Sequence, residues 1–200
     1  EYMPTYSERL VYDELKKQLP DSYVVFYSVE WSRDSNGKME KSEADFVVTH
    51  PNYGYVCLEV KGGRSLWVQE GEWYLEDNVE TRKLRRSPYT QAEESMYFFK
   101  DAYRKSANIS YKGIAAAGVI FPFFNVGSIA TEISNRQTEC TIDATKMQTL
   151  LLSIKAMFKT WGGPKFGVNM YSKSEHEALM ELIKKRIAIS AAAGALVKYK

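Results

Sequence analysis

Apolar and polar positions alternate over residues 45–61, and this pattern predicts two short strands. In the second strand one face is apolar and the other ends in an acid and an amine; the two sets are Val56, Leu58, Val60 and Cys57, Glu59, Lys61. In the first strand Phe46 and Val48 share a face, and Asp45 lies on the opposite one. The intervening Pro-Asn-Tyr-Gly sequence favours a turn, so the two strands are predicted to form a short antiparallel hairpin.

The register of this hairpin follows from burying both apolar faces in one core, because a one-residue slip would turn every side chain to the other face. With Phe46 and Val48 in that core, Asp45 must lie on the same side as Glu59 and Lys61. Pairing Asp45 across from Glu59 or Lys61 satisfies the pattern. We therefore expect two carboxylates and one ammonium group to meet at one end of the hairpin, a combination suited to metal-assisted cleavage of a phosphodiester.

The segment before the hairpin predicts a helix and a strand. Ser7 is a suitable N-terminal cap for a helix whose apolar stripe runs from Val11 to Leu19 and which ends before a proline. Residues 23–31 are rich in β-branched and aromatic side chains, which predicts a strand. Residues 32–41 are polar and contain an Asn-Gly pair, so we expect a loop or a hairpin tip there.

Five further elements are expected beyond residue 61. In chain order they are a small hairpin over 66–75, a helix that begins at Ser87-Pro88, an apolar strand over 113–124, a helix from Asp143 to about Trp161, and a last helix from Ser172 to about Ile189. The order of the core is thus helix, three strands, helix and strand, followed by an α-rich tail.

Composition narrows the class of protein. The chain has 200 residues and 44% hydrophobic content, enough for one domain over 1–200, with a core of about 7–124 and a helical C-terminal extension of about 142–200. The 27 Lys and Arg nearly balance the 25 Asp and Glu, so any surface that binds nucleic acid must be a local concentration of charge.

Cysteine usage and hydropathy point to a reducing compartment. Two cysteines are too few for a disulfide framework or a cysteine-based zinc site. There is no signal-like apolar segment and no apolar run long enough to span a membrane, so we expect a cytoplasmic protein without a membrane partner. The chain begins at Glu1 and not at Met, as a piece of a longer protein would.

The order of elements and the acidic motif resemble the PD-(D/E)xK nuclease superfamily, and more narrowly the nuclease-related domain family. The resemblance covers roughly residues 7–124, with Ala44 in the position that the superfamily name gives to proline. The matching pieces are Glu8 in the first helix, Glu43-Ala44-Asp45-Phe46, Glu59-Val60-Lys61-Gly62-Gly63, Gly71-Glu72-Trp73, and Pro88 with Gln91.

The resemblance implies a restriction-endonuclease-like α/β/α core around a mixed β-sheet, and a deoxyribonuclease dependent on Mg²⁺ or Mn²⁺. Asp45 and Glu59 would hold the metal ion together with the Val60 carbonyl, since Mg²⁺ keeps several waters and needs few protein ligands. Lys61 would orient the attacking water or neutralise charge on the phosphate. The alternative for the acids is an ordinary strand ion pair with Lys61.

Two residues outside the hairpin complete the expected site. Glu8 shares the buried stripe of Val11, so its carboxylate should have a partner such as a second metal ion, Lys61 or a bound water. Its alternative role is to stabilise the positive end of the helix. Gln91 lies in the first turns of the second helix, near a helix end that favours phosphate; its alternative is a plain surface glutamine. Glu43 shares the face of Asp45 and is a lesser metal candidate.

DNA is the expected partner. A cationic cluster just before the second helix could pair with several phosphates or be a solvated loop; its members are Arg82, Lys83, Arg85 and Arg86. The resemblance also implies DNA processing or repair, with a helicase or other module as a possible companion in a longer protein. Two rival hypotheses remain open, a non-catalytic nucleic-acid-binding module that kept the nuclease fold and a hydrolase or structural domain unrelated to nucleic acid.

Overall fold

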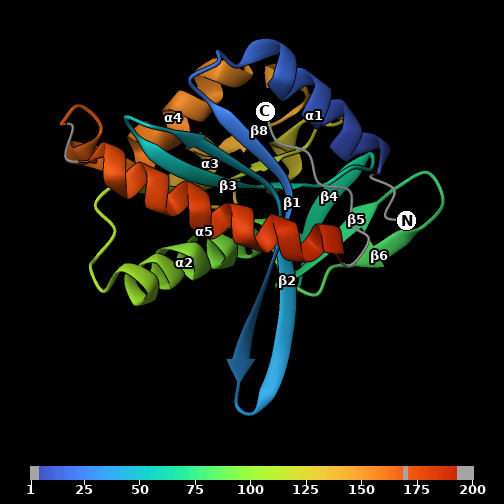
Figure 1. Cartoon of the computed structure of the whole chain (residues 1–200). Coiled ribbons are helices and arrows are strands. Elements are labelled where there is room, and N and C mark those ends of the chain that lie inside the picture. Colours follow the sequence, from blue (N-terminus) through green and yellow to red (C-terminus); the bar gives the residue numbers. More distant parts are fainter. Residues whose placement is uncertain (1–4, 169–170, 193–200) are drawn as a thin grey trace.

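A five-stranded mixed sheet forms the centre of the computed structural model, which describes residues 5–168 and 171–192 (Figure 1). Its strands run in the order β1-β2-β3-β7-β8, where β1–β3 are antiparallel neighbours and β3, β7 and β8 are parallel. Their bounds are β1 Val24–Ser35, β2 Lys38–His50, β3 Gly54–Val60, β7 Ile114–Ile120 and β8 Thr141–Ile142.

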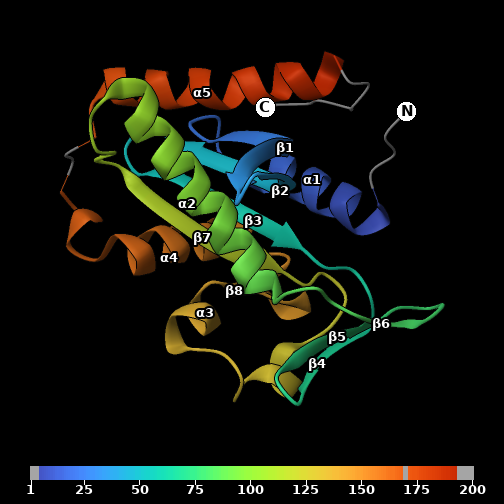
Figure 2. The same cartoon turned by 90° about the horizontal axis from the view of Figure 1, so that it is seen from below.

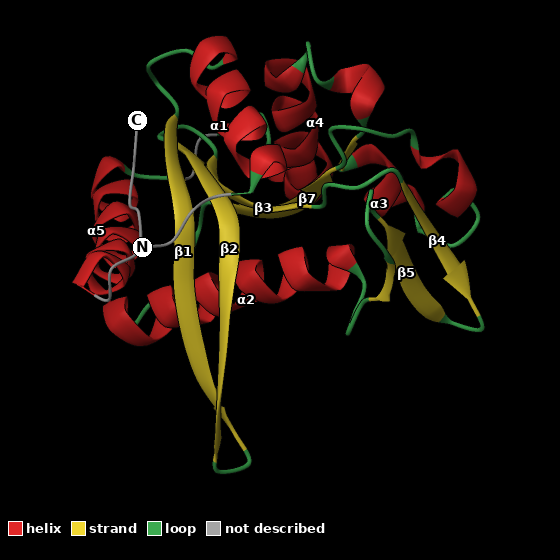
Figure 3. Ribbon diagram, turned by 90° about the vertical axis from the view of Figure 1, so that its right-hand side faces the viewer, coloured by secondary structure: helices red, strands yellow, loops and turns green. Residues whose placement is uncertain are grey.

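Helices cover both faces of this sheet (Figure 3). On one face lie α2 (Pro88–Ala107) and α5 (Lys173–Ala192), packed against side chains such as Val47 and Cys57. On the other lie α1 (Tyr6–Gln18) and α4 (Leu150–Gly162), packed against the alternate set that includes Phe46 and Leu58. The result is the predicted α/β/α arrangement.

The central hairpin has the register that its alternation predicts. Phe46 pairs with Leu58 and Val48 with Val56, and all four side chains belong to the apolar cluster on the α1–α4 side. Continuing this register places Asp45 across from Glu59, as predicted. The alternation is broken at Asp45, however, because Ala44 belongs to the apolar cluster on the α2–α5 side and Phe46 to the cluster on the α1–α4 side. The register alone does not set the direction of the Asp45 side chain, and its predicted position on the same face as Glu59 stays a prediction.

The hairpin of β1 and β2 extends far beyond the other strands as a two-stranded arm (Figure 1). Pairing continues to Ser35 and Lys38, and Asn36 and Gly37 form the turn with positive φ angles of 54° and 77°. Two successive residues with positive φ are typical of a tight hairpin turn. Of the two alternatives expected over 32–41, a loop or a hairpin tip, the structure therefore shows the hairpin tip, because cross-strand pairing holds this polar segment extended on both sides of the turn.

A second, three-stranded sheet lies beyond the C-terminal end of β3 (Figure 2). It contains β4 (Ser65–Gln69), β5 (Glu72–Glu76) and β6 (Thr81–Lys83), paired antiparallel. The predicted hairpin over 66–75 is confirmed, and β6 was not expected because its three residues are all exposed and carry no apolar pattern.

The capping predictions were right for two helices and shifted for two others. Ser87 caps α2, with Pro88 at the first helical position. At the start of α5 the Glu175 N–H donates to Ser172 Oγ at 3.2 Å, as a cap at Ser172 predicts. At α1 the cap is Thr5, not Ser7, because Thr5 and Glu8 satisfy each other's backbone N–H groups. Asp143 caps only a 3₁₀ turn (η2, Ala144–Lys146), and α4 begins later, at Leu150.

Short elements complete the C-terminal half. They are η1 (Val126–Ile129), α3 (Asn135–Glu139), and η3 (Gly163–Lys165) after α4. Cys57 and Cys140 are buried free thiols. Among residues 5–168 and 171–192, no helix combines the length and the apolar character needed to cross a bilayer.

The start of β3 depends on one glycine. Gly54 pairs with Ile114 of β7, has a φ of 141°, and leaves no room for a side chain, since an added Cβ would overlap the Ile114 backbone. We expect Gly54→Ala to lower the free energy of unfolding by about 3 kcal/mol, because both the strand pairing and the backbone angle would be disturbed. Urea denaturation measures this. Gly127→Ala is the control, since nothing lies within 4 Å of its Cβ position, and equal stability of the two variants would contradict the expectation.

Candidate active site

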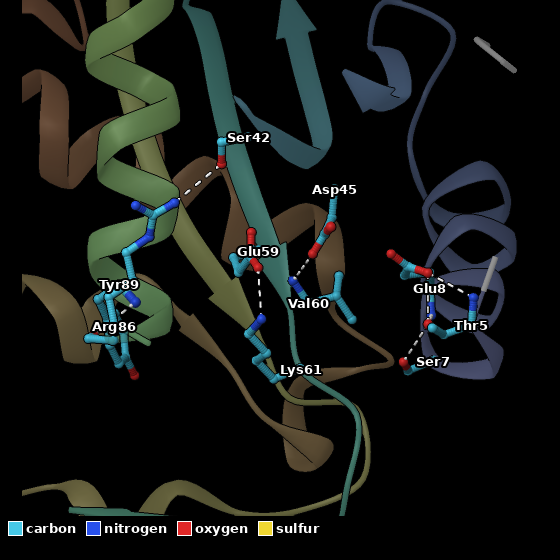
Figure 4. Close-up of polar contacts among 11 residues, drawn as sticks. Thr5, Ser7, Glu8, Ser42, Asp45, Glu59, Val60, Lys61, Arg86 and Tyr89 are labelled. Atoms are coloured by element: carbon cyan, nitrogen blue, oxygen red, sulfur yellow. Dashed lines mark hydrogen bonds and ion pairs between the residues drawn. The ribbon is translucent and has the colours of Figure 1, made fainter. Parts of the chain in front are cut away.

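The site begins where the pairing of β2 and β3 ends. The last paired residues are Phe46 and Leu58, and beyond them the Val60 N–H donates to Asp45 Oδ2 at 2.7 Å (Figure 4). The Asp45 carboxylate thus accepts a hydrogen bond from the backbone at the end of β3. This bond fixes the Asp45 carboxylate at the C-terminal edge of the strand.

Three carboxylates meet at this point. Glu8, Glu43 and Asp45 each offer one oxygen atom, and the three oxygens lie within 4.8 Å of one another. Glu43 and Asp45 come from β2, and Glu8 comes from the first turn of α1. Glu8 and Asp45 are each 7% exposed, so the cluster is largely withdrawn from water. We refer to it below as the acidic trio.

Hydrogen bonds fix two members of the trio. The Thr5 N–H and the Thr5 hydroxyl both donate to Glu8 Oε2 at 2.8 Å, while Ser28 Oγ donates to Glu43 Oε2 at 3.1 Å. Ser28 lies in β1 across from Asp45 and has a φ of 55°, which is unusual for a residue other than glycine. Backbone strain of this kind costs about 1–3 kcal/mol and is often found at functional sites.

Glu59 and Lys61 form an ion pair beside the trio. Lys61 Nζ lies 3.0 Å from Glu59 Oε1, and the Glu59 side chain is almost fully buried. Figure 4 shows this pair on one side of Val60 and Asp45 and Glu8 on the other. Glu59 was expected to hold metal next to Asp45, but the trio that could surround one ion contains Glu43 in its place.

Burial and mutual repulsion shift the pKa values of these acids. Burial raises the pKa of Asp45 well above its ordinary value, and the nearby charge of Glu59 adds to the effect, against the Val60 hydrogen bond. Burial likewise raises the pKa of Glu59, although Lys61 opposes the shift. The pKa of Glu43 is raised by burial and by Glu8, and lowered by the Ser28 bond. The site therefore favours either a proton or a cation at its centre.

The acidic trio lies in a cleft of about 1020 Å³, and Glu59 and Lys61 line the same cleft. Its charged lining residues come from strands, helices and loops that are distant in sequence. The acids are Glu8, Glu30, Glu43, Asp45, Glu59 and Asp77, and the cations are Lys41, Lys61, Arg82, Arg85, Arg86 and Arg186. Six acids thus face six cations, with three of the acids concentrated in the trio.

The predicted cationic cluster is divided by the structure. Arg82, Arg85 and Arg86 line the cleft, whereas Lys83 is not among its lining residues and pairs with Glu72 at 3.3 Å. Arg86 is held by Glu94 at 2.7 Å and donates to Ser42 at 3.3 Å.

Gln91 also lines the cleft, on the first turn of α2, as its predicted place in the site requires. Its role there stays a prediction.

Several residues of the site were missed from sequence. Thr5 could have been found, because Thr5-x-x-Glu8 is a readable capping box. Ser28 could not, since nothing in a strand sequence signals a positive φ at serine. Lys41 and Arg186 reach the cleft only through the β1–β2 arm and the position of α5, which depend on tertiary packing.

The raised pKa values predict how stability depends on pH when no metal ion is bound. In the unfolded chain these carboxyl groups titrate near pH 4, and in the folded chain at higher pH. Between those values the folded state holds more protons, so the free energy of unfolding falls as pH rises. Asp45→Asn removes one charge and keeps an oxygen for the Val60 N–H. We expect it to raise the free energy of unfolding by about 1 kcal/mol at pH 8 in EDTA.

Urea denaturation from pH 4 to 8 measures this, with the exposed Asp13→Asn as the matched control. A decrease in stability for Asp45→Asn, or an equal change in Asp13→Asn, would contradict the electrostatic account.

Comparison with known protein families identifies the family of this domain. No curated protein and no solved structure matches the chain. The model of the nuclease-related domain (NERD) family matches residues 4–121, more than half of the chain and all of the segment from α1 to β7. That segment holds the acidic trio, Glu59 and Lys61, and its mixed α/β architecture agrees with a restriction-endonuclease-like core. The chain therefore belongs to the nuclease-related domain family.

Proposed function

We propose that this domain hydrolyses phosphodiester bonds of DNA and requires Mg²⁺ or Mn²⁺, in a process such as DNA processing or repair. The single observation that carries the proposal is the acidic trio on the wall of a cleft that also contains Lys61 and a set of arginines. Carboxylate oxygens are the ligands that Mg²⁺ and Mn²⁺ prefer in proteins.

The three carboxylates of the acidic trio suit a bound divalent cation, because without one they repel one another. Three mostly buried carboxylates with oxygens within 4.8 Å repel one another, and the cluster has no cation of its own at its centre among the described residues. Lys61, the cation beside it, pairs with Glu59 and not with the trio. We assign Asp45 as the central ligand, with Glu8 and Glu43 on either side.

The bound metal ion would polarise the phosphoryl group and lower the pKa of a water molecule, which is the chemistry it supplies to this reaction. The chain itself positions the reacting groups. The Val60 N–H orients the Asp45 carboxylate, and Ser28 and Thr5 do the same for Glu43 and Glu8. Glu59 keeps the Lys61 ammonium at the edge of the trio, where it can bind a phosphate oxygen whose charge increases during cleavage.

The cleft also provides the charges that a polyanion requires. Arg82, Arg85 and Arg86 lie on the α2 side, and Lys41 and Arg186 on the side of the arm and α5. Phosphates passing through the cleft would meet these cations before they reach the acids. A surface of this kind gives affinity that depends strongly on salt.

Cleavage of DNA tests the proposal directly. Wild-type protein should nick supercoiled plasmid with Mg²⁺ or Mn²⁺ and not with EDTA. Asp45→Asn and Lys61→Ala should lower the rate by about 100-fold or more, because each removes a charge that acts at the reacting phosphate. Asp13→Asn is the control and should cleave normally. A wild-type protein that binds DNA but never nicks it would favour the non-catalytic module instead.

Arg186 provides a separate test of the path that DNA takes. It comes from α5, outside the range of the family match, and its guanidinium lies over the Phe98 ring at 4.5 Å. No described residue forms an ion pair with it among the salt bridges of the structure, so it is free to bind a phosphate. Arg186→Gln should weaken DNA binding and reduce the slope of log affinity against log salt by about one.

The matched control is Lys185→Gln, an exposed cation on the same helix that does not line the cleft. Fluorescence anisotropy with a labelled duplex at several salt concentrations measures both variants. If the slope of log affinity against log salt were unchanged in Arg186→Gln, the DNA phosphates would not contact Arg186.

A further inference from the structure

Two exposed aromatic rings stack on each other at the edge of the candidate active site. Tyr6 is 76% exposed and Phe123 is 42% exposed, although large aromatic side chains are usually mostly buried. Their ring centroids lie 5.8 Å apart with an interplanar angle of 10°, so the rings are nearly parallel. We call Tyr6 and Phe123 the aromatic pair.

The fold brings the aromatic pair together from distant segments. Tyr6 begins α1, two residues before Glu8. Phe123 follows the end of β7, in an apolar run where Phe121 and Phe124 are buried and only Phe123 points outward. Burial in the core thus explains why Phe121 and Phe124 are apolar, but it does not explain an aromatic residue at the exposed position 123.

The aromatic pair borders the residue that follows Lys61. A Cβ atom added to Gly62 would lie 3.9 Å from Phe123 Cε2 and 2.8 Å from Ser7 Oγ. Ser7 and Gly62 both line the cleft, as does Thr5 on the other side of Tyr6. In addition, the Lys61 N–H donates to the Ile120 carbonyl at 3.0 Å, which ties the Lys61 backbone to the strand that leads to Phe123. Tyr6 and Phe123 do not line the cleft themselves, so the pair lies at its margin, beside Ser7 and Gly62.

We propose that the aromatic pair stacks with an unpaired base of the nucleic acid, next to the phosphodiester held at the acidic trio. This inference rests on the proposed function and names its substrate class, DNA that is single-stranded or locally unpaired. A flat, exposed ring beside a cleft for phosphates matches the way proteins bind single strands, by combining cationic grooves with aromatic stacking.

Size and geometry favour a base over the alternatives. A stable protein partner buries about 800 Å² on each side, and two rings provide only a small part of such a surface. A base inside a duplex has both faces covered by its neighbours, so it cannot stack on Tyr6 unless the helix end opens. The rings therefore select for unpaired bases.

The test compares binding of single-stranded and duplex DNA in the Lys61→Ala background, which keeps the acidic trio and in which cleavage is expected to be slow. The probes are a fluorescein-labelled single-stranded 20-mer, the same 20-mer with abasic sites, and its blunt duplex, all in Mg²⁺. Adding Tyr6→Ala should weaken binding of the intact single strand by about fivefold or more and leave the duplex unchanged. Phe123→Ala should act in the same direction, and Tyr6→Trp should restore binding.

Tyr97→Ala is the matched control, because Tyr97 is an exposed aromatic residue in the middle of α2, outside the aromatic pair. It should bind all three probes normally. The abasic strand should bind the parent and Tyr6→Ala equally weakly, which separates stacking from phosphate contacts. Thermal unfolding of each variant checks that the exposed substitutions leave the fold intact.

The outcomes separate this inference from the proposed function. Equal loss on single strand and duplex, or no loss in either ring variant, would overturn the role of the aromatic pair. Metal-dependent plasmid nicking by the wild-type protein would still support the nuclease in that case. If the wild-type protein neither nicks plasmid nor binds any probe, both proposals fail.

Discussion

Repulsion among carboxylates at one end of the sheet is the constraint on which the rest of the site depends. Glu8, Glu43 and Asp45 bring three acidic oxygens within 4.8 Å in a place with little access to water. The chain offsets part of this cost with donors from its own backbone and hydroxyls, at Val60, Ser28 and Thr5. Lys61 offsets only part of the charge, because its ammonium group is paired with Glu59. A divalent cation would reduce the repulsion by offsetting two of the three negative charges, and DNA would then meet a less acidic centre between cationic walls.

The architecture explains why these acids can meet at all. β2 and β3 separate after Phe46 and Leu58, so the end of the hairpin is open. α1 lies on one face of the sheet and supplies Glu8, whose carboxylate meets those of Glu43 and Asp45 at this opening. Residues of the arm of β1 and β2, of the loop before α2 and of α5 then line the cleft. The parts outside the family match thus contribute to the surface that DNA would contact.

Much of this arrangement could be predicted from the sequence, because the strongest signals are local. Strand alternation fixed the register that places Asp45 across from Glu59, and the apolar stripe of α1 placed Glu8 on a buried face. The predictions failed where local signals are weak or compete. β8 has only Thr141 and Ile142 and no periodicity, and the polar arm is extended only because its strands pair with each other.

The composition of the trio was harder to predict than its location. Glu43 and Glu59 both lie near Asp45, and the choice between them depends on side-chain direction and on the ion pair with Lys61, which no sequence pattern encodes. The same holds for Arg186, Tyr6 and Phe123, which are near the site only because distant elements pack together.

The most direct test of the central claim is a titration of the protein with Mn²⁺, followed by the electron paramagnetic resonance signal of the free ion. The account predicts one protein-bound Mn²⁺ at pH 8, weaker binding as the trio takes up protons at lower pH, and loss of this site in Glu43→Gln as well as in Asp45→Asn. It would be contradicted if wild-type protein bound no Mn²⁺ at millimolar concentration, or if binding were the same in all three proteins.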